Sequence, residues 1–182
     1  MKKTILFFEI FVTIFTLCAI ASISASASPY GKGLYNVNVP YGSQTALSIS
    51  TSGDISIPIT PVSNGALASN TSIITVTSTD VMGYKLYIRA LNNTYMDNVG
   101  STLPASANGS PAALATNTWG YNTDASNNFA GITLTDTLIR SISTPAPSGD
   151  VTNVKYGIKV DMLKPAGNYV ANVVYTAVPQ TD

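Results

Sequence analysis

The chain contains no histidine, and its single cysteine, Cys18, lies in an N-terminal apolar stretch. Glutamate is equally scarce, because Glu9 is the only one. Histidine is the side chain that most often serves as a general base near neutral pH, and cysteine and histidine are the usual ligands of zinc. Catalysis would have to rest on aspartate, lysine or tyrosine, so the sequence favours a structural or binding protein over an enzyme.

The remaining acids are single aspartates without a D-x-D pair: Asp54, Asp80, Asp97, Asp124, Asp136, Asp150, Asp161 and Asp182. Capping of turns is the favoured role for most of them. Carboxylates from distant segments can meet in a fold, so a carboxylate-based secreted hydrolase stays as the weakest alternative. Calcium needs several oxygen ligands in one loop, and Asp124 among Asn122, Asn127 and Asn128 is the best local candidate. We expect no metal and no cofactor.

The N-terminus has the three parts of a secretory signal peptide. Lys2 and Lys3 precede an apolar run over residues 5–23, which ends in the small residues of 24–27. Cleavage after Ala27 gives three regions: 1–27 as signal peptide, 28–43 as N-terminal arm or edge strand, and 44–182 as β-sandwich domain. The alternative is a retained membrane anchor, because the run approaches the length that spans a bilayer. The small residues at its end favour cleavage, and hence a secreted or cell-surface protein.

Cleavage also decides the charge and the redox chemistry of the product. Of nine basic and nine acidic residues, Lys2, Lys3 and Glu9 leave with the signal, so the net charge is about −1 (7 − 8). A chain without a basic stripe is a poor partner for nucleic acid, and no second apolar run predicts a membrane segment. Without Cys18 the domain has no disulfide, so its 155 residues (182 − 27) must be stabilised by core burial.

Thr, Val, Ile and Tyr are abundant, and no segment shows helical periodicity, which favours β structure. About eight short strands with turns every ten residues predict an all-β fold, a single antiparallel β-sandwich of Ig-like or jelly-roll-like type. Residues 51–54 predict a hairpin-like connection, 92–118 a long surface excursion, and 145–149 a break. The strand-like segments are 46–50, 55–59, 72–79, 84–90, 119–121, 132–135, 138–143, 154–161 and 168–178.

Two of these segments carry the clearest side-chain patterns. In 84–90, Tyr84, Leu86 and Ile88 share one face and Lys85, Tyr87 and Arg89 the other, as in a half-buried strand. In 168–178 both faces are apolar, which predicts a central strand or one whose outer face is covered.

Aromatic side chains are the candidate ligand contacts. Exposed tyrosine or tryptophan can stack on sugar rings or fill a partner's pocket, and Trp119 stands beside Tyr121. The alternative for Trp119 is the core tryptophan of a sandwich. Tyr87 is the better candidate for an exposed aromatic, although with Lys85 and Arg89 it also fits an ordinary solvated face.

Three short motifs occur in a familiar order: G-Y-x-L at 83–86, N-T-W-G-Y at 117–121, and P-A-G-x-Y at 165–169 before the strand-like 174–178. Their succession resembles the WxL-like cell-surface domains of bacteria, over roughly residues 71–178. Tyr84 stands where that family has its tryptophan and Leu86 where it has its leucine. The resemblance implies non-covalent attachment to peptidoglycan and places Tyr84 and Leu86 with Tyr87, Trp119 and Tyr121 among the candidate binding residues.

The sequence therefore predicts an exported cell-envelope module, structural or adhesive, that binds peptidoglycan, another envelope glycan or surface proteins. The alternative is a self-assembling pilus or fibre subunit, in which an N-terminal arm such as Leu34 to Val39 adds a strand to the next subunit. Asn70, Asn92 and Asn108 match N-glycosylation sequons, which matter only in a host that glycosylates.

Overall fold

A computed structural model describes residues 46–79 and 81–180. The predicted signal peptide (1–27) and N-terminal arm (28–43) lie outside the described residues. The described chain is built from strands, turns and extended segments, and it contains no helix, hence none long and apolar enough to cross a membrane. The strands are β1 (Ala46–Thr51), β2 (Ala66–Thr79), β3 (Gly83–Ala90), β4 (Met96–Asn98), β5 (Ser101–Leu103), β6 (Thr118–Asn122), β7 (Thr137–Ile142), β8 (Ala146–Val160) and β9 (Val173–Gln180).

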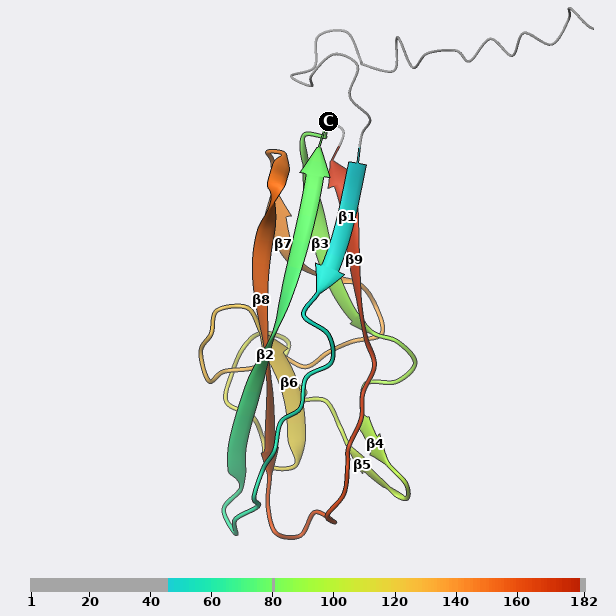
Figure 1. Cartoon of the computed structure of the whole chain (residues 1–182). Coiled ribbons are helices and arrows are strands. Elements are labelled where there is room, and N and C mark those ends of the chain that lie inside the picture. Colours follow the sequence, from blue (N-terminus) through green and yellow to red (C-terminus); the bar gives the residue numbers. More distant parts are fainter. Residues whose placement is uncertain (1–45, 80, 181–182) are drawn as a thin grey trace, which may run out of the picture.

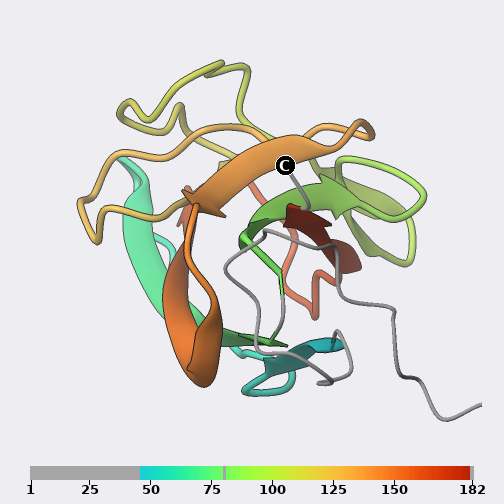
Figure 2. The same ribbon diagram turned by 90° about the horizontal axis from the view of Figure 1, so that it is seen from above.

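The nine strands form two packed sheets and a small hairpin. One sheet has four strands in the order β1-β2-β8-β6, the other has three in the order β7-β3-β9, and β4 pairs with β5. Every pairing between these strands is antiparallel. The two sheets face each other along an elongated molecule (Figures 1 and 2). This arrangement confirms the predicted all-β antiparallel sandwich.

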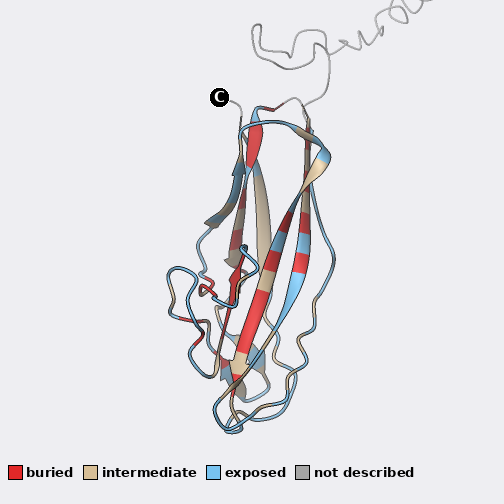
Figure 3. Ribbon diagram, turned by 90° about the vertical axis from the view of Figure 1, so that its left-hand side faces the viewer, coloured by how far each residue is buried: buried red, intermediate tan, exposed pale blue. Residues whose placement is uncertain are grey.

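Alternation of side chains explains why these segments are strands. In β3 the inward residues Tyr84, Leu86 and Ile88 are completely buried, whereas Lys85 is exposed and Tyr87 and Arg89 are half-buried. The C-terminal half of β8, which ends at Val160, also alternates between buried and less buried residues. Figure 3 shows this alternation as red and paler bands along the strands. One face of each sheet therefore supplies a common core, as a period of two residues requires.

Four local predictions were wrong. Residues 55–59 and 132–135 form no strand, although Ile55, Ile57, Ile59 and Ile132 pack into or against the core. Strand β1 pairs with β2 and not with residues 55–59, its predicted hairpin partner. Strand β2 begins six residues before the expected 72–79. Residues 145–149 do not break the chain, because β8 begins at Ala146 and pairs with β2 across a register shift.

Two further expectations were only partly right. Strand β9 is shorter than the predicted 168–178 segment and lies at the edge of its sheet, not at its centre. Its outer face is uncovered at Val178, which is 42% exposed. The excursion over 92–118 contains the β4–β5 hairpin, and Leu103, Ser106 and Leu114 within it are buried.

Candidate interaction surface

Four of the five candidate binding residues lie in the core. Tyr84 and Leu86 are 0% exposed, Trp119 is 1% exposed and Tyr121 is 6% exposed. A ring in such a position has no free face for a ligand. Among the five, only Tyr87 reaches the surface, as a half-buried side chain on the outer face of β3.

Trp119 is anchored as a core tryptophan. Its Nε1 donates a hydrogen bond to the backbone oxygen of Thr94 at 3.0 Å, and its ring lies tilted against that of Tyr156 with 6.4 Å between centroids. The indole therefore fixes the segment before β4 to the four-stranded sheet. A buried tryptophan satisfies its polar nitrogen in this way.

Tyr84 joins the two sheets through an ion pair. Its hydroxyl donates to Oδ2 of Asp150 at 2.6 Å, and Arg140 donates to both oxygens of that carboxylate, at 2.9 and 2.8 Å. The three side chains come from β3, β8 and β7. The hydrogen bonds from Arg140 hold the pKa of Asp150 below its usual range. Burial, followed by the neighbouring Asp150, raises the pKa of Tyr84 to about 12.

A second contact between the sheets is a pair of tyrosines. The hydroxyls of Tyr156 in β8 and Tyr175 in β9 are hydrogen-bonded to each other. Burial raises the pKa of both phenols, so both stay neutral. Their hydroxyls satisfy each other inside the sandwich and are not offered to a ligand.

Opposite the core, the three-stranded sheet exposes a mixed face that we call the outer face. Lys85, Tyr87 and Arg89 lie along its central strand. Beside them the register places Val178, Thr176 and Val174 of β9, and Ser141 and Leu138 of β7. Leu138 is 49% exposed. The outer face therefore combines one aromatic ring, two cations and a margin of exposed aliphatic side chains.

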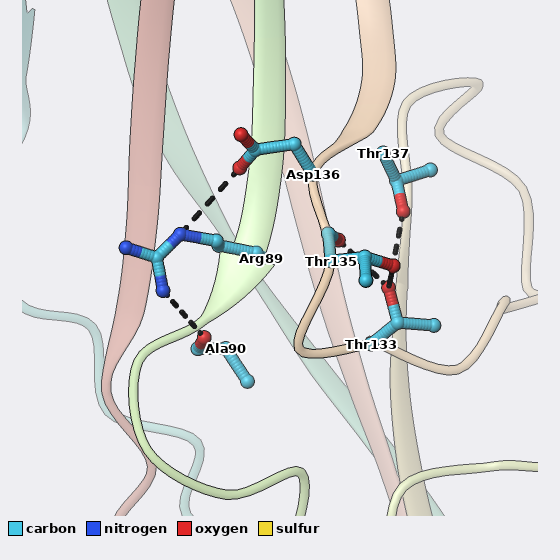
Figure 4. A network of polar contacts seen from close by, with 6 residues as sticks. All are labelled: Arg89, Ala90, Thr133, Thr135, Asp136 and Thr137. Carbon is cyan, nitrogen blue, oxygen red and sulfur yellow. Dashed lines mark hydrogen bonds and ion pairs between the residues drawn. The ribbon is translucent and has the colours of Figure 1, made fainter.

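Arg89 is partly neutralised at one end of the outer face. Its Nε lies 3.5 Å from Oδ1 of Asp136, and its guanidinium also donates to the oxygen of Ala90. The hydroxyl of Thr133 donates to the oxygen of Thr135 at 2.8 Å in the loop that carries Asp136 (Figure 4). Both charged side chains stay solvent-accessible, so this pair is weak and leaves Arg89 available to an anion.

A β-bulge lies beside Tyr87. The pairing of β3 with β7 shifts between Leu86 and Tyr87, so that Leu86 faces Arg140 but Tyr87 faces Leu138. Bulges bend a strand and re-aim its side chains, and they are frequent next to binding sites. Sequence periodicity gives no signal for this bulge, because the extra residue, Ile139, is itself apolar.

The loop considered for calcium is built around a lysine. Nζ of Lys155 donates to the backbone oxygens of Ser126 and Ala125 at 2.8 and 3.2 Å, and to Oδ1 of Asn127 at 2.9 Å. The backbone amide of Ser126 donates to Asp124 and lowers its pKa. An ammonium group therefore occupies the centre of the loop oxygens that a cation would need.

Two other described aspartates, Asp161 and Asp97, have local roles. Asp161 accepts hydrogen bonds from Asn117 and from the backbone of Leu163, and Asp97 pairs through its backbone with Val170. No hydrogen bond joins two aspartates within 46–79 and 81–180. Asp97 also lines a shallow polar hollow of about 270 Å³ with Asn92, Asn93, Asn172, Val170 and Ala171.

No protein-family model matches the chain, and no curated protein matches it. The resemblance to WxL-like domains therefore stays a prediction from three short motifs.

Proposed function

We propose that this protein is an exported cell-envelope module that binds envelope polymer non-covalently through its outer face. The observation that carries the proposal is the row Lys85, Tyr87, Arg89 on the surface of β3, the one place where a predicted binding aromatic is accessible. Because strand residues on one face repeat every second position, each cation lies about 7 Å along the strand from the tyrosine.

This spacing suits a polymer that alternates sugar rings with acidic groups. The tyrosine ring offers a flat apolar surface to a sugar, and the cations can pair with carboxylate or phosphate groups on either side. Thr176 adds a hydroxyl opposite Tyr87, and Ser141 adds one opposite Lys85. We therefore assign the wall binding implied by the WxL-like motifs to Tyr87, because Tyr84 and Leu86 have no accessible surface.

The test is retention of the mature chain, residues 28–182, on purified bacterial sacculi. We expect Tyr87→Ala to lower the retained fraction about tenfold, a loss of about 1.4 kcal/mol that is ordinary for a central aromatic contact. Tyr95→Ala is the matched control, because Tyr95 is a 39% exposed tyrosine outside the three-stranded sheet. Equal retention of both variants would show that the outer face is not the binding site.

Two treatments identify what is bound. Sacculi stripped of their anionic polymers should retain less protein if Lys85 and Arg89 pair with acidic groups, and added salt should act in the same direction. Loss of retention after protease treatment of the sacculi would instead assign a surface protein as the partner.

A further inference from the structure

The two flanks of the sandwich are closed differently. On one flank a short turn joins β7 to β8, and the Arg140–Asp150 ion pair with Tyr84 links the sheets there. On the other flank β1 and β9 lie side by side as the edges of different sheets (Figure 2). Among the described residues, no strand pairs with the outer edge of either. This second flank is the open flank.

Ile49 shows that the core is incompletely covered at the open flank. It lies directly opposite Val76 in the β1–β2 ladder, so both side chains belong to the inner face. Val76 is 0% exposed, whereas Ile49 is 40% exposed. Within residues 46–79 and 81–180, the three-stranded sheet ends at β9, and no further strand covers this inward-facing isoleucine.

Beyond β1, an extended segment of the chain covers the core. Ile55, Ile57 and Ile59 alternate with exposed residues and pack against the core. Within the described chain, no backbone–backbone hydrogen bond ties residues 53–61 to a neighbour. An extended segment with an apolar residue at every second position thus covers the core beyond Thr51, while Ile49 on β1 stays partly uncovered.

We propose that the arm Leu34–Val39 of a second copy adds to the free edge of β9 and covers Ile49. In this arm Tyr35, Val37 and Val39 alternate with Leu34, Asn36 and Asn38. One face of the added strand is therefore apolar and suits the core, and the other is mostly polar and suits solvent. Strand addition at a free sheet edge gives affinity through the backbone and specificity through alternate side chains.

The strand directions favour a second copy over the chain's own arm. Ala46 pairs with Thr79 and Gln180 with Gly83, so β1 begins at the end of the sandwich where β9 finishes. An arm antiparallel to β9 would run about 17 Å away from that end. Residues 40–45 reach at most about 25 Å, so a return to Ala46 in the same chain would use about two thirds of their reach along the strand direction alone, whereas the arm of a second copy needs no return.

Each copy then offers an arm at one place and an edge at another. Such a head-to-tail contact does not close on itself unless a ring forms, so it produces filaments. This inference concerns the open flank and does not depend on polymer binding by the outer face.

The test uses one variant for each half of the contact, in the mature chain 28–182. Val37→Asp charges the inward face of the arm, and Ile49→Lys places a cation where the arm would cover the core. Light scattering and electron microscopy should show filaments for the unchanged chain and monomers for each variant alone. An equimolar mixture of the two variants should give heterodimers, because one intact arm and one intact edge remain.

Asn36→Asp is the matched control for the arm, since it adds the same charge on the outward face and should leave assembly unchanged. Trp119 emission checks that every variant is folded, because the indole is buried. A mature chain that stays monomeric at high concentration, including one whose own arm fills the edge, would overturn the proposal. So would assembly of the Val37→Asp variant at the level of the unchanged chain.

Discussion

At the residue scale, the carboxylate of Asp150 is a polar contact that links the two sheets. Asp150 accepts hydrogen bonds from Tyr84 and Arg140, and 22% of its side chain is exposed. Its lowered pKa means that the ionised form is favoured in the folded state. This contribution is complete above the ordinary carboxyl pKa of about 3.9 and is lost as the pH falls through the lowered pKa.

We therefore expect Asp150→Asn to lower the free energy of unfolding by about 1 kcal/mol at pH 7. The unchanged chain should lose stability below about pH 4, and the variant should lose less of it there. Urea unfolding followed by Trp119 emission measures both quantities. Asp136→Asn removes the exposed pair with Arg89 and should leave stability almost unchanged. Equal losses in the two variants would contradict the role assigned to Asp150.

The sequence did not separate the aromatic residues of the core from the one on the surface. Tyr84 and Leu86 lie on the apolar face of an alternating strand, so their burial was foreseeable. Trp119 and Tyr121 lie in a strand of five residues, four of which are buried. So short a strand shows no alternation by which to assign faces. The Arg140–Asp150 pair escaped prediction because residues 145–149 resembled a break, although β8 runs through them.

At the element scale, the pairing of β6 with β8 depends on a glycine beneath an aromatic ring. Gly157 faces Gly120 across the ladder, and Phe129 is completely buried. A Cβ atom on Gly157 would lie 2.3 Å from Cζ of Phe129. Gly157→Ala should force the ring aside and cost about 1–3 kcal/mol, as overpacking in a core does.

The matched control for this change is Gly109→Ala, because nothing lies within 4 Å of a Cβ atom there. Thermal unfolding of both variants measures the difference, and we expect a lowered midpoint for Gly157→Ala alone. An unchanged midpoint for Gly157→Ala would show that Phe129 is free to move.

The segment 53–61 shows why alternation does not by itself predict a strand. Its isoleucines alternate as in β1, but a ladder also needs a partner for the backbone, and Pro58 and Pro61 have no amide hydrogen to donate. Sequence patterns record which side chains are buried. They do not record whether a neighbouring backbone is within hydrogen-bonding distance.

Hydrogen exchange distinguishes these two kinds of extended chain. Amides in 53–61 should exchange rapidly, because no backbone hydrogen bond protects them within the described chain. Amides of β2 and β8, which pair over most of their length, should exchange slowly. Mass spectrometry of peptides from both regions gives the comparison. Protection of 55–59 equal to that of β2 would indicate a ladder that the structure lacks.

At the scale of the whole molecule, both sheets contribute to one core cluster. Val76, Ile158 and Trp119 from the four-stranded sheet belong to the same cluster as Leu86 and Ile88 from the other. The composition predicted this single sandwich correctly, because period-two patterns and a lack of helical stripes identify the class. It could not predict the strand order or the open flank, since these depend on pairings far apart in sequence.

A shared core predicts that the sheets unfold together. Trp119 is the only tryptophan and is 1% exposed, so its emission reports the core, whereas far-ultraviolet circular dichroism reports the strands of both sheets. In urea the two signals of the chain 28–182 should follow one transition with the same midpoint, as in two-state domains of about this size. Removing residues 28–43 should leave that coincidence intact, because the described residues 46–180 already form a core cluster that joins both sheets. A tryptophan transition that precedes the loss of strand signal would mean that β6 and its neighbours detach from the other sheet before the molecule unfolds.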